Sequence, residues 1–301
     1  MFPAPNPLPW QPYPAAPIPR SSPRRVYLAR RQWLSPQLLR IWLTGRAHPE
    51  SPNSLADFPS HALGCHVKLL LPTPAQTQLT LPHWSDTGAV WPAAELRPIS
   101  RTFTLAAWDP QRQQVAIDIA MPSEKPMHSQ PGPAAHFARY APLGSPLGLA
   151  GPGGPVLANL AARHWYLFAD LTGLALVRAL LAMKPPQLQA RAFIHLPANS
   201  QTLALPGVHW CIGSGQPLLQ QAEQLGALNL AHSWVVLACE HTDWRALEHH
   251  WLRSRALPRQ RLYSLPYWRA EQSEEHFHHE RHQALDAIPA AHWHTPTEAQ
   301  T

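Results

Sequence analysis

The stretch HWYLFADLTGLALVRALLAM, residues 164–183, decides the fold of the second half of the chain. Its first part, residues 164–170, is a nearly continuous apolar run that ends in an aspartate, which is typical of a buried strand. Residues 172–183 follow at once and predict a helix. A strand that passes directly into a helix is the repeating unit of a parallel sheet whose two faces are covered by helices.

The same alternation continues toward the C-terminus. Further strands are predicted over residues 190–197, 207–213, 233–240 and 261–268, and helices over 216–228 and 242–255. Continuous apolar strands that alternate with helices indicate an α/β domain built on a parallel sheet. After about residue 272 the chain becomes polar and rich in histidine, and we expect one more helix and a loose end there.

Toward the N-terminus the pattern becomes β-like. Short runs with β-branched or aromatic residues cover 25–34, 38–45, 66–72, 101–109 and 115–121, and turn residues separate them, including Gly-Pro-Gly-Gly at 151–154. Several short strands at this spacing predict a closed antiparallel barrel. One stretch differs, because GPAAHFARYA at 132–141 has helix formers after a Gly-Pro start and predicts a short helix.

The chain is therefore expected to be an α+β protein of two domains. An antiparallel Greek-key β-barrel is predicted over residues 23–155, and an α/β parallel-sheet domain over residues 160–275. The proline-rich residues 1–22 are a predicted disordered tail, because proline fixes φ and cannot donate a backbone hydrogen bond. A docking peptide is the alternative for this tail, and residues 276–301 form a predicted histidine-rich tail.

Charge and cysteine usage narrow the class of protein. The net charge is +6, but the arginines are scattered and no nucleic-acid-binding motif accompanies them, so we expect an anionic small ligand and no nucleic acid. The three cysteines, Cys65, Cys211 and Cys239, lie far apart and form no CxxC pair. They predict neither a disulfide framework nor a zinc site, and are interpreted as buried thiols in a reducing cytoplasm.

The expected location is the cytoplasm, and the default expectation is a monomer. No segment approaches the ~18 consecutive apolar residues of a membrane helix, and the N-terminus lacks the basic start and apolar run of a signal peptide. In the histidine-rich end, His278 and His282 are four apart and would share one helix face, so they could bind a metal. Because no acidic or cysteine ligand lies at a diagnostic spacing, we interpret this end as a solvated tail and predict no metal site.

Two segments place small or polar residues where ligands bind. Asp170 and Thr172 follow the first strand of the α/β domain, and ligands of open parallel sheets bind at that edge. Helix capping is the alternative role for both residues. The helix that begins at Gly132 has small residues in its first turn, which allow a phosphate to approach the backbone. The chain has no GxGxxG fingerprint.

Six segments in order resemble the siderophore-interacting proteins, a branch of the ferredoxin reductase superfamily. HVKLLLP is similar to that family's H-V-K-L-x-x-P strand, and RTFTLAAWD to its R-x-Y-T-x-R-x-x-D flavin motif. GPAAHFA is similar to G-P-A-x-x-W-A, YLFADLTGLAL to the turn D-E-T-A-L-P-A, WVVLACE to W-x-A-G-E, and PYWRAE to the ending G-Y-W-R-x-G. The resemblance covers about residues 24–275.

The resemblance implies an FAD-dependent ferric-siderophore reductase, which passes electrons from NADPH or NADH through FAD to the Fe(III) of an anionic chelate. Arg101 is then expected to pair with the FAD pyrophosphate, Phe103 to stack on the flavin or its ribityl chain, and Thr104 to hydrogen-bond near the reactive ring nitrogen of the flavin. The other implied binding residues are Thr102, Gly132, Pro133, Ala134 and Ala135 for FAD, Asp170, Thr172, Glu240, Tyr267, Trp268 and Arg269 for the nicotinamide side, and Lys68 for the chelate. Thr104 and Thr172 are the candidate catalytic residues.

The sequence departs from the family pattern at several of these segments. The departures include Phe103 for tyrosine, Ala106 for the second arginine of the flavin motif, Leu171 and Gly173 in the sheet-edge turn, Cys239 before Glu240, and Glu248 where a basic residue is expected. They leave two alternatives open: a divergent non-catalytic protein that binds flavin or an iron chelate, and a flavin reductase with an acceptor other than iron.

Overall fold

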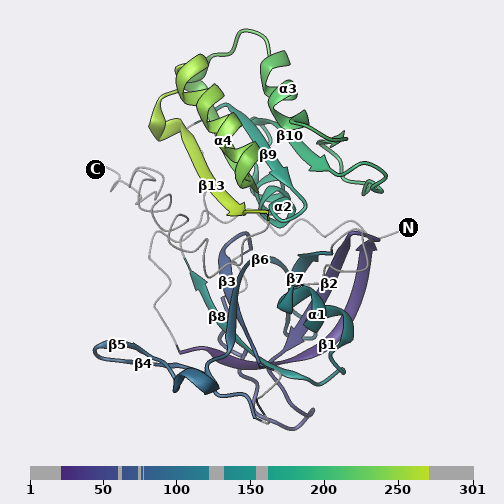
Figure 1. The fold of residues 1–301 in the computed structure, drawn as a ribbon, viewed down its shortest axis with the longest axis vertical. Helices are drawn as coiled ribbons and strands as arrows, with labels where there is room; N and C mark the ends of the chain where they lie inside the picture. The colour runs from purple at the N-terminus through teal and green to yellow at the C-terminus, as the bar shows by residue number, and fades with distance from the viewer. Residues whose placement is uncertain are drawn as a thin grey trace. The chain divides into compact units, whose positions relative to one another are not determined.

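The computed structural model describes residues 22–59, 63–73, 76, 78–121, 132–153 and 162–270. The chain forms two compact units, which are described separately (Figure 1). Among the described residues, one unit holds those up to Gly153 together with 199–204, and the other holds 162–198 and 205–270. The predicted domain bounds at 155, 160 and 275, and nearly all of both predicted tails, lie outside the described residues.

The first unit is a closed antiparallel barrel, as predicted. Its strand order is β1-β2-β7-β6-β3-β8, with β8 returning to pair with β1, so neighbours in space are often distant in sequence as in a Greek key. One helix, α1 (Pro133–Tyr140), packs against β7, β2 and β3. The barrel strands are β1 (Arg24–Ser35), β2 (Leu38–Thr44), β3 (His66–Leu71), β6 (Ile99–Asp109), β7 (Gln114–Ala120) and β8 (Pro146–Gly153).

Two features of this unit differ from the prediction. A small hairpin of β4 (His83–Ser85) and β5 (Gly88–Val90) precedes a short 3₁₀ helix, η1 (Ala94–Leu96), and was not expected. The turn predicted at Gly-Pro-Gly-Gly is wrong, because residues 151–153 belong to β8. Two glycines of this run are required by the backbone of β8: Gly151 has a φ of +101°, and a Cβ on Gly153 would lie 2.4 Å from Nε2 of His66.

The second unit is a parallel sheet of order β11-β10-β9-β12-β13, as predicted. Its strands are β9 (His164–Asp170), β10 (Gln189–Leu196), β11 (Val208–Ile212), β12 (Ser233–Glu240) and β13 (Leu262–Trp268). Its helices are α2 (Leu174–Met183), α3 (Pro217–Gln224) and α4 (His241–His249), with 3₁₀ turns η2 (Leu230–His232) and η4 (Arg259–Arg261) and a π-helical turn η3 (His250–Ser254). None of the described helices is long and apolar enough to cross a membrane.

Helix α3 ends earlier than predicted. The prediction extended it to residue 228, but the helix stops at Gln224. The guanidinium of Arg255 donates to the backbone carbonyls of Leu225 and Gly226, so these terminal carbonyls are satisfied by a side chain instead of by further helical turns.

The two faces of the sheet bury different helices. Tyr166 and Phe168 of β9 face one side, where they join a buried cluster with residues of α3 and α4, including Leu218 and Leu247. Figure 1 shows α3 and α4 next to each other on this unit. On the other side α2 begins close to β12, where a Cβ on Gly173 would lie 2.1 Å from the carbonyl oxygen of Ala238. The departure at Gly173 therefore permits this close packing, and it fixes where the carboxyl edge of the sheet meets α2.

Candidate functional site

Strand β6 carries the predicted flavin motif, and its pairing with β3 determines which side chains share a face. Lys68 lies opposite Thr102, whereas Arg101 lies opposite Leu69 and Phe103 opposite Val67. Directly opposed residues of an antiparallel pair project to the same face. The strand pair therefore places Lys68 with Thr102 on one face, and Arg101 with Phe103 on the other face.

Within β6, the side chains are half-buried at its start and buried in its middle. Thr104 is buried, and Leu105 beyond it is fully buried in the barrel. Arg101 is half-buried, and its guanidinium donates to the carbonyl of Ser100 at 2.7 Å. A β-bulge between Leu105 and Ala107 shifts the register with β7, so the end of the motif is displaced relative to an uninterrupted ladder.

The N-terminus of α1 offers backbone donors to an anion. Its N-cap is Gly132, which contributes no side-chain cap, and among the described residues a Cβ there would meet nothing within 4 Å. Ala134 and Ala135 are buried, which anchors the first turn on the barrel. The first-turn N–H groups have no intrahelical partner and carry a partial positive charge. Backbone donors of this kind suit a pyrophosphate group.

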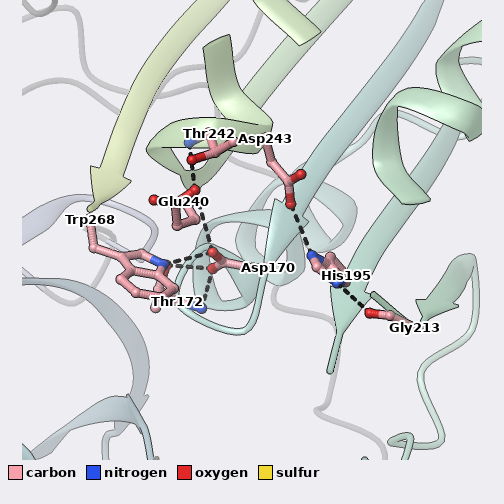
Figure 2. Close-up of polar contacts among 8 residues, drawn as sticks. All are labelled: Asp170, Thr172, His195, Gly213, Glu240, Thr242, Asp243 and Trp268. Carbon is pink, nitrogen blue, oxygen red and sulfur yellow. Dashed lines mark hydrogen bonds and ion pairs between the residues drawn. The ribbon is translucent and has the colours of Figure 1, made fainter. Parts of the chain in front are cut away.

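In the second unit, Asp170 is the centre of a hydrogen-bond network at the carboxyl edge of the sheet (Figure 2). Its Oδ1 accepts from the backbone N–H of Thr172 at 2.7 Å and from the Thr172 hydroxyl at 2.5 Å. Its Oδ2 accepts from the Glu240 backbone N–H and from the Trp268 indole N–H, both at 2.8 Å. Burial raises the pKa of Asp170, and these hydrogen bonds oppose that shift. Because each oxygen faces two donors, the network fits the carboxylate form.

Glu240 joins this network to helix α4. Its carboxylate is the N-cap of α4 and accepts from the backbone N–H of Thr242 at 2.5 Å. The same carboxylate accepts from the backbone N–H of Ala270 at 3.2 Å, just beyond the end of β13. The ends of β9, β12 and β13 and the start of α4 are thus held together by two carboxylates, and the exposed indole of Trp268 donates to that of Asp170.

A second polar pair lies at the same edge (Figure 2). His195, at the end of β10, has its Nδ1 2.9 Å from Oδ2 of Asp243 and its Nε2 3.0 Å from the carbonyl oxygen of Gly213. Both partners are acceptors, so both ring nitrogens donate only when the imidazole is protonated. The hydrogen bond to Asp243 raises the pKa of His195 despite partial burial.

Comparisons with known proteins match both units. A family model described as siderophore-interacting FAD-binding domain matches residues 27–156, and one described as siderophore-interacting protein matches residues 162–271. The solved structure of the siderophore-interacting protein SipS from Aeromonas hydrophila is 32% identical, with a TM-score of 0.71 over 89% of this chain and 100% of SipS. The chain belongs to the siderophore-interacting protein family.

Two further comparisons concern an enzyme relative and the fold. Ferric vibriobactin reductase ViuB of Vibrio cholerae is 28% identical over 288 residues, which are 89% of this chain and 97% of ViuB. Phthalate dioxygenase reductase is 12% identical with a TM-score of 0.54, over 84% of this chain and 70% of that protein, and this likeness concerns the fold alone. The match to ViuB makes the present siderophore-interacting protein a relative of an oxidoreductase.

The structure joins some of the predicted residues of this siderophore-interacting protein and separates others. It links Asp170, Thr172, Glu240 and Trp268 directly through hydrogen bonds. Arg269, which follows β13, lines a cavity next to α4 instead. On the barrel, Lys68 does not share a face with Arg101 and Phe103. The assignments of individual residues to FAD, nucleotide or chelate remain predictions.

The sequence analysis missed His195 and Asp243. One signal was available: His195 stands near the end of a predicted apolar strand, and side chains at the carboxyl ends of parallel strands face the ligand edge. Asp243 gave no comparable signal, since an acidic residue in the first turn of a helix is ordinary.

The unexpected Glu248 of this siderophore-interacting protein has a structural role. Its Oε1 accepts from the hydroxyl of Ser264 at 2.8 Å and from the guanidinium of Arg259 at 3.3 Å. The same Ser264 hydroxyl accepts from the indole of Trp244 at 2.6 Å. An acidic residue at this position therefore ties α4 to β13.

The His195–Asp243 pair predicts a pH-dependent stability. The pKa of His195 is higher in the folded protein than in the unfolded chain, so the protonated His195 stabilises the fold. This contribution is complete below the ordinary histidine pKa of about 6.5, and it is lost as pH rises through the raised pKa of the folded state. We expect Asp243→Asn to lower the free energy of unfolding by about 2 kcal/mol at pH 6 and by clearly less at pH 9. Urea denaturation at both pH values measures this difference.

The control for this experiment is Asp86→Asn, which changes an exposed carboxylate outside the pair. We expect it to alter stability by less than about 0.5 kcal/mol at either pH. An Asp243→Asn effect of equal size at pH 6 and pH 9 would show that the pair does not hold the imidazolium.

Proposed function

We propose that this protein is an FAD-dependent ferric-siderophore reductase, which takes electrons from NADPH or NADH and releases iron as Fe(II). The observation that carries this proposal is the match of both units to siderophore-interacting family models, residues 27–156 and 162–271. The name of the relative ViuB, a ferric vibriobactin reductase, supports the same reaction class.

The barrel residues fit FAD. The N-terminus of α1 at Gly132 supplies backbone N–H donors for a pyrophosphate, and Arg101 supplies a guanidinium suited to the same anion. The ring of Phe103 offers a stacking surface on the same face as Arg101. When bound, FAD supplies the chemistry that converts a two-electron donor into single-electron delivery to iron. The residues of the chain bind and orient it.

The carboxyl edge of the second unit is the proposed place for the pyridine nucleotide. Ligands of open parallel sheets bind at this edge, where Asp170, Glu240 and Trp268 are already fixed by mutual hydrogen bonds. A fixed edge positions a ligand without an ordering cost at the moment of binding. In this proposal Thr172 orients Asp170 through its hydroxyl, and Thr104 borders the flavin.

The acceptor is proposed to be an anionic ferric chelate that reaches the enzyme as a free small molecule. The excess of positive charge, +6 over the chain, attracts such a ligand, and Lys68 of β3, on the opposite face of the β3–β6 pair from Arg101 and Phe103, is the proposed contact. The three buried free thiols are compatible with a reducing cytoplasm, which we propose as the location. We propose that the protein acts as a monomer.

The test begins with the visible spectrum of the purified full-length protein, with FAD added if needed. We expect a bound flavin that bleaches on anaerobic addition of NADPH or NADH, and recovers as Fe(II) appears in a ferrous trap after a ferric siderophore is added. Absence of flavin binding would overturn the proposal. A flavin that no nucleotide reduces would instead favour the non-catalytic binder, and transfer to other acceptors but not to iron would favour the alternative reductase.

Matched arginine variants connect this result to the barrel site. We expect Arg101→Ala to raise the Kd of FAD about 10- to 100-fold, because a charge-assisted hydrogen bond is lost. Arg97→Ala is the control, since Arg97 is exposed and donates to the carbonyl of Pro92 in the same unit. Equal FAD affinity in Arg101→Ala and Arg97→Ala would remove Arg101 from the site.

A further inference from the structure

A cavity of about 590 Å³ lies next to α3 and α4 in the second unit. It runs along α4, and its walls include Gln216 and Glu223 from the region of α3 and Thr242 and Arg245 from α4. Arg269, just after β13, also lines it. The cavity therefore adjoins the carboxyl edge where the Asp170 network ends, and it is large enough for a nucleoside-sized group.

The α4 wall of this cavity is a basic stripe. His241, Arg245 and His249 are spaced four residues apart, so they share one face of the helix, and all three line the cavity. Arg245 and His249 are exposed. Within the part of the chain that the structure describes, no hydrogen bond or ion pair engages the guanidinium of Arg245. A cation with these properties is available to a ligand.

The charge balance of the cavity favours an anion. Its lining contains two arginines, Arg245 and Arg269, and one carboxylate, Glu223. Burial, with a contribution from Arg255, lowers the pKa of His250, so this lining imidazole is neutral at pH 7. The two arginines therefore outweigh the single carboxylate and leave a net positive charge. A planar guanidinium binds phosphate oxygens through paired, charge-assisted hydrogen bonds.

The chemistry of the two nicotinamide cofactors differs at one group. NADPH carries a phosphate monoester on the adenosine ribose, with a charge near −2 at pH 7, whereas NADH has a hydroxyl there. Sites that accept NADH commonly hydrogen-bond this hydroxyl with a carboxylate, whereas sites for NADPH present an arginine. In this cavity the arginines outnumber the carboxylate, and the stripe on α4 lies beside the proposed nucleotide edge.

We infer that the cavity beside α4 binds the adenosine 2′-phosphate of NADPH, with Arg245 as its principal contact, and that the enzyme selects NADPH over NADH. This inference rests on the proposed function, because it identifies the electron donor of that reaction. Arg245 is a binding residue in this assignment. It contacts a part of the cofactor that does not react, so it acts on nucleotide affinity and not on the chemistry.

The direct test measures nucleotide fragments that cannot donate electrons. Calorimetry on the full-length protein compares 2′,5′-ADP, which carries the phosphate monoester, with 5′-AMP, which lacks it. We expect wild type to bind 2′,5′-ADP at least about 10-fold more tightly, and Arg245→Ala to weaken 2′,5′-ADP about 10- to 100-fold while leaving 5′-AMP nearly unchanged. Arg245→Lys, which keeps the charge without the fork, should lie between them.

The matched control is Arg253→Ala. Arg253 is an exposed arginine of the π-helical turn after α4 and does not line the cavity. We expect its affinities for both fragments to equal those of wild type. If Arg253→Ala weakened 2′,5′-ADP as much as Arg245→Ala did, the effect would come from overall charge and the inference would be overturned.

Kinetics separate failure of this inference from failure of the proposed function. Flavin reduction by both nucleotides with equal kcat/KM, together with equal binding of the two fragments, overturns NADPH selection and leaves the reductase intact. Binding of 2′,5′-ADP that depends on Arg245, without flavin reduction by either nucleotide, supports the site and overturns the reductase. A raised KM for the ferric chelate in Arg245→Ala, with 2′,5′-ADP affinity unchanged, would assign the stripe to the chelate and overturn the inference.

Discussion

Asp170→Asn is expected to lower the free energy of unfolding of the second unit by about 3 kcal/mol. The carboxylate of Asp170 accepts four hydrogen bonds in a buried position, two at each oxygen. Asparagine keeps one acceptor oxygen and places an NH₂ group where the other oxygen stood. That group then faces two donors, and each buried donor left without an acceptor costs about 1–3 kcal/mol. Urea denaturation followed by circular dichroism measures the loss.

Trp268→Phe and Thr172→Val are the graded controls for this prediction. Each removes one donor from Asp170 and leaves the carboxylate with three hydrogen bonds. We expect each to cost about 1 kcal/mol, since a net hydrogen bond contributes that much. Asp170→Asn with a loss no larger than that of Trp268→Phe would mean that the carboxylate does not organise the sheet edge.

Asp170→Asn is also expected to loosen the carboxyl edge of the sheet locally. Amide hydrogen exchange should accelerate most at Glu240, whose backbone N–H loses its acceptor, and at the start of α4, which Glu240 caps. Unchanged exchange at these positions in Asp170→Asn would contradict the network as a fixed platform for the nucleotide.

The sheet was predictable because its central strands, β9 and β12, are buried on both faces. β9 and β12 span 164–170 and 233–240, the same bounds that the apolar runs indicate. Burial on both faces leaves no polar alternation, so an apolar run and its turn residues define the whole strand. The barrel was predictable as a class for a related reason, since its strands are short and separated by turn residues.

The elements that were missed lack such a pattern. The β4–β5 hairpin consists of two three-residue strands with exposed residues, so no core face constrains its sequence. Strand β8 contains Gly148, Gly151 and Gly153, which permit close contacts with neighbouring strands, and residues of this type locally indicate a turn. Local sequence cannot distinguish a glycine that turns from a glycine that packs.

The candidate site shows the same division between local and distant information. The link between Asp170 and Thr172 is local, and its position after a strand made both residues candidates. The His195–Asp243 pair joins residues 48 apart, and the basic stripe of α4 gains its meaning only from the cavity that it lines. Neither could be inferred without the arrangement of the strands.

Asp118→Ala is expected to destabilise the barrel by about 3–5 kcal/mol. Asp118 and Arg40 are directly opposed on β7 and β2, and form a bidentate pair with distances of 2.6 and 2.8 Å. Their side chains are only 1% and 8% exposed. Removing Asp118 leaves a buried guanidinium without its counter-ion, and an uncompensated buried charge costs about that much. Thermal and urea denaturation of the full-length protein measure the loss.

Two further variants test whether the cost of Asp118→Ala comes from the burial of the charge that it leaves behind. Asp57→Ala breaks an ion pair with Arg24 in which Asp57 is 79% exposed, so it should cost less than about 1 kcal/mol. The double variant Arg40→Met with Asp118→Leu removes both charges and should recover most of the stability, because a buried ion pair contributes little more than apolar residues of similar size. If the double variant were as unstable as Asp118→Ala, the pair itself, and not the orphaned charge, would stabilise the barrel. Recovery of stability would mean that this barrel keeps the pair for the register of β2 against β7, on which the alignment of its other strands depends.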